Sequence, residues 1–122
     1  MDDAVCAVRA ALEQGILPGG GVALKDTALG MSTETKGSQI LSYAMLSPMA
    51  KILDNAGADY TQVAILLRDK GIGMDVSDMS VRDMMEAGII DPTKVTKEAL
   101  KNAVSVATTL LGTHTIITNV RG

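Results

Sequence analysis

Apolar side chains recur every three or four residues along most of this 122-residue chain, a spacing typical of amphipathic helices. Glycine and proline divide the pattern, because glycine commonly ends helices and proline is favoured in their first turn. We expect a helix that starts at the glycines of positions 19–21 and ends near Gly30. Further helices are expected over residues 3–14, 38–46, 47–56 and 59–70, and the longest one from the Asp91-Pro92 turn to Gly112.

Three segments depart from this simple pattern. Met74–Val76 is expected to form a short strand, and the β-branched run Thr115–Val120 a second one. Between them, Asp78 or Ser80 is expected to cap a short helix. The last strand has no evident partner, so its unpaired backbone groups favour pairing with another chain. The predicted fold is mainly α, with a short β element and a C-terminal edge strand.

Composition narrows the possible functions. The formal charge is 11 − 14 = −3 and no basic run is present, which disfavours nucleic-acid binding. No apolar stretch approaches the roughly 20 residues that a membrane span needs. The single cysteine fits a reducing compartment, and the acidic N-terminus lacks the pattern of a secretion signal. We therefore expect a cytoplasmic protein with neither nucleic-acid nor membrane partners.

The glycine triplet Gly19-Gly20-Gly21 is the most unusual local feature. Glycines that open a helix let backbone amides approach an anionic ligand, but the same residues also form flexible turns. The segment matches neither common phosphate-binding motif. Gly21-Val22 stands where a P-loop needs Lys and Ser or Thr, and Leu24 stands at the last glycine position of a dinucleotide fingerprint. The glycines alone therefore leave a turn and a ligand site as alternatives.

Two longer blocks carry a family resemblance. One combines Asp2-Asp3-Ala4 with Gly19-Gly20-Gly21-Val22-Ala23-Leu24, and the other is Gly88-Ile89-Ile90-Asp91-Pro92-Thr93-Lys94-Val95. In this order and separation they resemble the C-terminal part of group I chaperonins, the sixty-kilodalton heat-shock family. The resemblance implies a chaperonin equatorial-domain-like helical bundle. It makes residues 1–14 the end of the intermediate-domain hinge helix and residues 15–122 the C-terminal half of the equatorial ATPase domain.

The resemblance also implies roles for individual residues in binding ATP. Asp3 would be catalytic and orient the water that attacks the γ-phosphate, as a carboxylate can accept a proton or hydrogen bond. Gly19, Gly20 and Gly21 would lie against the nucleotide, Ile89 would pack on the adenine, and Asp91 would accept hydrogen bonds from the ribose. From the residues alone, a helix cap is the preferred explanation of Asp3. Asp91 can cap a helix within an Asp-Pro turn, and this role is compatible with a ribose contact.

This chain departs from the family pattern in two ways. Asp75-Val76-Ser77 stands where the family carries an Asn-Ala-Ala run at the adenine edge, and an ionised Asp can only accept hydrogen bonds. The sequence also lacks the Asp-Gly-Thr-Thr phosphate loop and the metal-binding aspartate of the family. Mg²⁺ and the phosphates of ATP would then be held by absent parts of the parent protein, and the isolated chain should not hydrolyse ATP usefully.

The resemblance favours part of a subunit of an ATP-dependent protein-folding chaperonin. Its strand Thr115–Val120 would pair with a neighbouring subunit in a homo-oligomeric ring, while a co-chaperonin and unfolded clients would bind through missing domains. The alternative is a stand-alone helical interaction or scaffold module that has lost ATPase function. An independent enzyme is disfavoured, because the sequence offers no nucleophile–base pair or metal set. Apolar faces that lack their partners should make the isolated chain self-associate.

Overall fold

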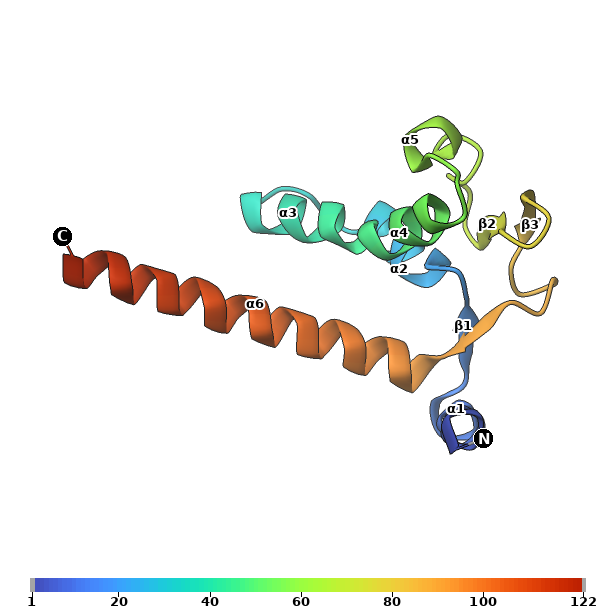
Figure 1. The fold of residues 1–122 in the computed structure, drawn as a ribbon, viewed down its shortest axis with the longest axis horizontal. Helices are drawn as coiled ribbons and strands as arrows, with labels where there is room; N and C mark the ends of the chain where they lie inside the picture. Colours follow the sequence, from blue (N-terminus) through green and yellow to red (C-terminus); the bar gives the residue numbers. More distant parts are fainter. Residues whose placement is uncertain (1, 122) are drawn as a thin grey trace. The chain divides into compact units, whose positions relative to one another are not determined.

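The chain is mainly helical with a few short strands in the computed structural model (Figure 1). The structure describes the backbone of residues 2–121 and the side chains of residues 2–113. The chain divides into two compact units. The terminal unit comprises Met1–Gly15 and Pro92–Gly122, and the central unit comprises Ile16–Asp91. The helices are α1 (Asp2–Gln14), α2 (Val22–Gly30), α3 (Lys36–Met45), α4 (Ser47–Asn55), α5 (Tyr60–Val63) and α6 (Thr93–Arg121). The strands are β1 (Ile16–Pro18), β2 (Ile72–Asp75), β3 (Ser80–Asp83) and β4 (Ile90–Pro92).

Helices α2 and α4 form the centre of the central unit, where α2 contacts both α3 and α4 (Figure 1). The buried positions of α2 are spaced three residues apart, as expected for one helix face. The core of the unit contains no aromatic side chain among its fully buried members, and methionine supplies much of its volume. Its buried residues are Val22, Met49, Leu53, Leu67 and Met84.

The strands form two small two-stranded sheets. In one, β1 pairs with β4. In the other, β2 and β3 form an antiparallel hairpin whose register runs from Ile72 opposite Asp83 to Asp75 opposite Ser80. The predicted strand at Met74–Val76 is therefore confirmed for Met74 and Asp75, which belong to β2, while Val76 lies in the turn that follows. The short helix predicted to follow Asp78 or Ser80 is wrong, because Ser80–Asp83 extends beside β2 and the chain then turns.

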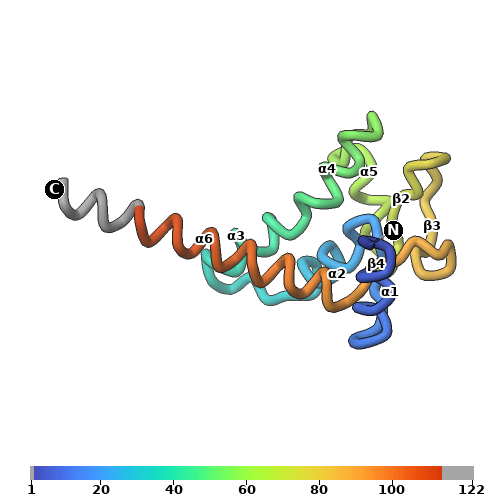
Figure 2. Tube along the Cα trace, turned by 60° about the horizontal axis from the view of Figure 1, so that its bottom comes forward, coloured from blue at the N-terminus to red at the C-terminus, as the bar shows by residue number. Residues whose placement is uncertain are grey.

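In the terminal unit, α1 contacts the first turns of α6 (Figure 2). The Thr93 amide donates to the Gly15 carbonyl over 3.0 Å, directly where α6 begins. Nearby, Lys94 Nζ lies 2.7 Å from Glu13 Oε2. The hydrogen bond from this ammonium, aided by its charge, holds the pKa of the Glu13 carboxyl below its usual value. These contacts fix α1 at the amino end of α6.

Helix α6 continues through Gly112 to Arg121, so the predicted helix end at Gly112 and the predicted edge strand Thr115–Val120 are both wrong. A helix satisfies its backbone groups within the segment, whereas a strand needs a partner, and none pairs with this segment in the described structure. Threonine hydroxyls also adapt to the helix by donating to carbonyls four residues earlier. Thr108, Thr109 and Thr113 do so at 2.8–3.0 Å.

The helices of the described residues do not meet the requirements of a membrane span. None of them is both long enough and sufficiently apolar to cross a bilayer.

A charged pair is built into the buried face of α2. The Lys25 side chain is 1% exposed, and its Nζ lies 2.7 Å from Asp26 Oδ1. The same ammonium donates hydrogen bonds to the carbonyls of Asp69 at 2.7 Å and Ile72 at 3.0 Å, whereas its contact with Asp26 Oδ1 is an ion pair without a hydrogen bond. Asp26 Oδ2 accepts a hydrogen bond from the Gly71 amide at 2.9 Å. We call Lys25, Asp26 and these three partners the α2–β2 clamp.

Removal of one charge from this clamp should destabilise the chain. Lys25→Met leaves the Asp26 carboxylate largely buried without its cation, which should lower the free energy of unfolding by about 3 kcal/mol. Chemical denaturation measures this change. In the double variant Lys25→Met/Asp26→Leu most of the loss should be regained, because no unpaired charge remains.

The matched control is Lys51→Met, which removes an exposed lysine from α4. Its effect should stay within about 0.5 kcal/mol. Equal losses in Lys25→Met and Lys51→Met would contradict the stabilising role of the clamp.

Candidate functional site

The three predicted glycines form a tight turn between β1 and α2. Gly20 and Gly21 have φ values of 67° and 80°, the left-handed region that disfavours other residues. A Cβ at Gly21 would lie 2.8 Å from the backbone of Met49, and one at Gly20 would lie 2.8 Å from Met84 Cε. Glycine is therefore required here by the fold of the central unit itself. Among the described residues, the Gly20 and Gly21 amides donate no hydrogen bond, and both glycines are half-buried.

The glycine turn lies directly beside the second predicted block. The Gly19 amide donates to the Ile89 carbonyl over 2.8 Å, and a Cβ on Gly19 would lie only 3.1 Å from Ile89 C. Ile89 is half-buried, and Asp91, two residues further on, is exposed within β4. Asp91 thus belongs to a short strand that leads into α6, rather than to the turn expected from the Asp-Pro pair.

The β2–β3 hairpin approaches the same end of α2. A Cβ at Gly73 would overlap the Val22 side chain, so β2 lies directly against the first residue of the helix. Asp75 is two residues along the strand from Gly73, on the same face. The central unit therefore brings together three of the predicted site segments, which are the glycine turn, the Ile89–Asp91 segment and the Asp75-Val76-Ser77 run.

Asp75, Val76 and Ser77 form the start of the hairpin turn. Asp75 Oδ1 accepts hydrogen bonds from the Ser77 amide at 3.0 Å and the Ser77 hydroxyl at 2.6 Å. The Val76 side chain is 39% exposed. Asp75 is thus already used to close its own turn, a local role typical of aspartate.

The rest of this turn is held by a second aspartate. Asp78 Oδ1 accepts from the Ser80 hydroxyl at 2.6 Å, and Asp78 Oδ2 accepts from Arg82 at 2.7 Å. The Ser80 hydroxyl, together with its amide and the Arg82 guanidinium, holds the pKa of the Asp78 carboxyl below its usual range. The Asp78 carboxylate of the hairpin turn is therefore ionised at neutral pH.

Asp3 belongs to the other unit. It is exposed in the first turn of α1 beside Asp2, where a negative charge is favourable for the helix dipole. Its predicted catalytic role and its alternative role at the helix start both remain predictions.

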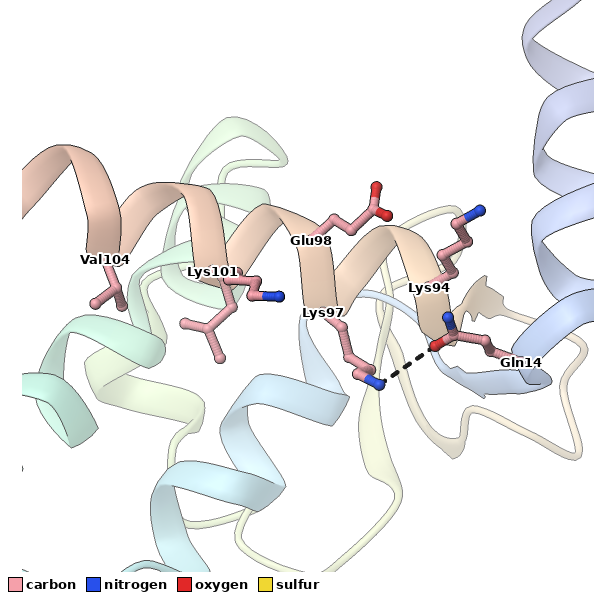
Figure 3. A pocket seen from close by; sticks show the side chains of 7 residues that line it. Gln14, Lys94, Lys97, Glu98, Lys101 and Val104 are labelled. Atoms are coloured by element: carbon pink, nitrogen blue, oxygen red, sulfur yellow. Dashed lines mark hydrogen bonds between the residues drawn. The ribbon is translucent and has the colours of Figure 1, made fainter.

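The terminal unit also has an open groove of about 490 Å³ on α6 (Figure 3). Lys94, Lys97 and Lys101 line it with Gln14 and Glu98. Lys94 is paired with Glu13, and Lys97 Nζ donates to Gln14 Oε1 over 3.3 Å. No predicted site residue lines this groove.

No group of three or more His, Cys, Asp and Glu side chains in the described part of the chain is arranged to hold a metal ion.

Comparison with known proteins identifies the family. Residues 1–121 match the sequence profile of the TCP-1/cpn60 chaperonin family. The chain belongs to the TCP-1/cpn60 chaperonins. It is 38% identical over 130 aligned positions to the chloroplastic chaperonin GroEL of Cyanidium caldarium, which supports the group I resemblance. The alignment covers 98% of this chain but 24% of that protein, so the chain spans about a quarter of the length of this curated relative.

Solved chaperonin structures share the fold. A group III chaperonin in the open state matches with a TM-score of 0.72 and 28% identity, over 84% of this chain and 24% of that one. An open-state monomer of a group II chaperonin from Methanococcoides burtonii matches with a TM-score of 0.71. Its identity of 24%, over 79% of this chain and 27% of that one, supports the fold alone. The predicted mainly α, chaperonin equatorial-domain-like fold is thus confirmed.

Sequence reasoning missed the α2–β2 clamp and strand β1. Lys25 follows the apolar run Val22-Ala23-Leu24, and Val22, Lys25 and Ala28 share the buried face of α2. A lysine at a core position of a helix that is otherwise apolar on that face is the signal that could have identified the clamp. Strand β1 has only three residues, one of them a proline, and offers no such signal.

The glycine turn gives a direct test of this packing. Gly21→Ala should lower the free energy of unfolding by about 2–4 kcal/mol, because an alanine there is strained at positive φ and overlaps the Met49 backbone. Gly37→Ala in α3 is the control, since nothing lies within 4 Å of the added Cβ. It should stabilise the chain by up to about 1 kcal/mol. Denaturation midpoints that fall equally in both variants would contradict this account of the turn.

Proposed function

We propose that this chain is the part of a chaperonin subunit that forms the adenine and ribose side of an ATP site. The observation that carries the proposal is the Gly19–Ile89 hydrogen bond of 2.8 Å, which sets the glycine turn against the segment that leads to Asp91. The family resemblance assigns both segments to the nucleotide. The whole subunit would serve ATP-dependent protein folding in the cytoplasm.

The chemistry of the residues in the central unit fits this role. The Gly20 and Gly21 amides, which donate no hydrogen bond within the described residues, could donate to nucleotide oxygens at the start of α2, where the helix dipole favours negative charge. The exposed Asp91 carboxylate can accept from both ribose hydroxyls, and Ile89 offers apolar surface to a base. Asp75 is held by Ser77, so its contact with the adenine edge would differ from that of an asparagine.

The remaining parts of the reaction would come from elsewhere. The sequence has no Asp-Gly-Thr-Thr run, so the parent protein would supply the phosphate loop and the residues that hold Mg²⁺, which neutralises phosphate charge when bound. Asp3 would orient the attacking water once α1 approaches the nucleotide. Ring assembly, a co-chaperonin and unfolded clients belong to the same proposal for the whole subunit.

The alternative is an interaction module that has kept the fold and lost the ATPase function. Asp75 in place of asparagine favours it, because its carboxylate is already engaged within the hairpin turn. Both proposals place the chain in the same family but differ in whether nucleotide binds.

A nucleotide titration of the ¹⁵N-labelled chain separates these alternatives. With ADP, the amide signals of Gly20, Gly21 and Asp91 should shift with a Kd of about 1 mM or weaker, because the phosphates lack most of their partners. Asp91→Ala should abolish the shifts, since hydrogen bonds to a charged group contribute about 1.5–3 kcal/mol each. Asp54→Ala, which removes an exposed carboxylate of α4, should leave them unchanged.

Absence of any shift at these amides would favour the scaffold module. Micromolar binding by the chain alone would contradict the proposal that the phosphate side of the site lies outside it.

The proposed catalytic role of Asp3 is tested by measuring ATP hydrolysis in a chimera. In this chimera the chain replaces the matching segment of the chloroplastic relative. Asp3→Asn should lower kcat at least about 100-fold with nucleotide affinity unchanged, because only the activation of water is lost. Asp2→Asn, its neighbour in the same helical turn, should retain the activity of the unmodified chimera. Equal losses of activity in the two variants would exclude a specific catalytic role for Asp3.

A further inference from the structure

The α2–β2 clamp connects two elements of the proposed site, the start of α2 and the start of β2. Lys25 lies one helical turn after the glycine turn, and its ammonium reaches the carbonyl of Ile72, the first residue of β2. Asp26 reaches the Gly71 amide just before that strand. The charged pair therefore contacts the chain on both sides of the point where β2 begins.

We propose that Lys25 and Asp26 are positioning residues. They fix the position of β2 along its strand axis relative to the glycine turn, and with it the position of Asp75. This proposal rests on the proposed nucleotide site. Neither side chain is assigned a contact with nucleotide, and both act through the backbone of residues 69–72.

Hydrogen bonds fix the position of a strand better than apolar packing does, because they are directional. The Gly73–Val22 contact holds β2 against α2 at a position that admits no side chain, but an apolar contact has no preferred direction. A shift of β2 by one residue would turn its side chains to the opposite face. The hydrogen bonds from Lys25 and to Asp26 have fixed lengths and angles, so they oppose such a shift.

If Lys25 and Asp26 served stability alone, apolar residues would be expected at these two positions. Well-packed apolar residues often replace a buried ion pair at no cost in stability. A lysine and an aspartate at these positions are therefore better explained by the register that they impose on β2 than by the stability that they add.

The double variant Lys25→Met/Asp26→Leu separates register from stability, because it removes the directional bonds without leaving a buried charge. Leu53→Ala is the matched control, since it opens a cavity in the core of the same unit and destabilises the fold without removing a hydrogen bond of the clamp. Asp26→Asn is a milder variant that keeps an acceptor for the Gly71 amide. All are compared as intact chains at a temperature where each is fully folded by circular dichroism.

Two readouts are used. The first is amide hydrogen exchange at Gly71, which should accelerate at least about tenfold in the double variant relative to Leu53→Ala at matched stability. The second is the ADP titration followed by amide shifts, where the double variant should bind at least about fivefold more weakly and Leu53→Ala within about twofold of the unmodified chain. Asp26→Asn should fall between them in both readouts.

The outcomes separate this inference from the proposed function. If the unmodified chain shows no ADP shifts, the proposed nucleotide site fails, and with it the positioning of that site. If the unmodified chain binds ADP but the double variant binds as well as Leu53→Ala does, the nucleotide site stands and the positioning role of Lys25 and Asp26 is overturned.

Discussion

The close approach of α2 to its neighbours is the constraint on which the central unit depends. It requires that two positions carry no side chain, Gly21 against the Met49 backbone and Gly73 against Val22. With these contacts in place, Val22 is fully buried between α4 and β2, and the core forms around it. The same approach fixes where the glycine turn ends and where the hairpin starts. The proposed site is therefore a consequence of how the core is packed.

This packing explains the glycine triplet without a ligand. The sequence alone left a turn and a ligand site as alternatives, and the structure explains each glycine by a contact within the protein. The space beside Gly19, Gly20 and Gly21 is taken by Ile89, Met84 and Met49. A ligand is thus not needed to explain why these residues are glycine. What supports the proposed nucleotide binding is the neighbourhood of the triplet, namely two amides that donate no hydrogen bond within the described residues and the segment that ends in the exposed Asp91.

The sequence predicted the elements whose signals are local. Helices α1, α2 and α4 follow from apolar spacing and from their glycine and proline boundaries. Asp59 caps α5 by accepting from the Thr61 amide, but this helix ends at Val63, so the predicted helix over residues 59–70 is wrong beyond that residue. The failures depend on distant contacts. Strand β3 exists because β2 lies beside it, and the clamp exists because α2 packs on residues 69–72. The Thr115–Val120 segment shows the converse, since β-branched residues continue a helix when no strand is available to pair.

Exposed apolar side chains remain in both units, and they bear on the choice between a chaperonin subunit and an interaction module. Val8 and Leu12 of α1 are 62% and 84% exposed, and Ile65 of the central unit is 77% exposed. Surfaces of this kind mark contacts with other protein. A subunit of a larger assembly and a free-standing interaction module would both require them, so these surfaces do not distinguish the two. The distinction lies in the polar chemistry of the central unit, because only a nucleotide site needs the Gly20 and Gly21 amides and the Asp91 carboxylate to contact one ligand.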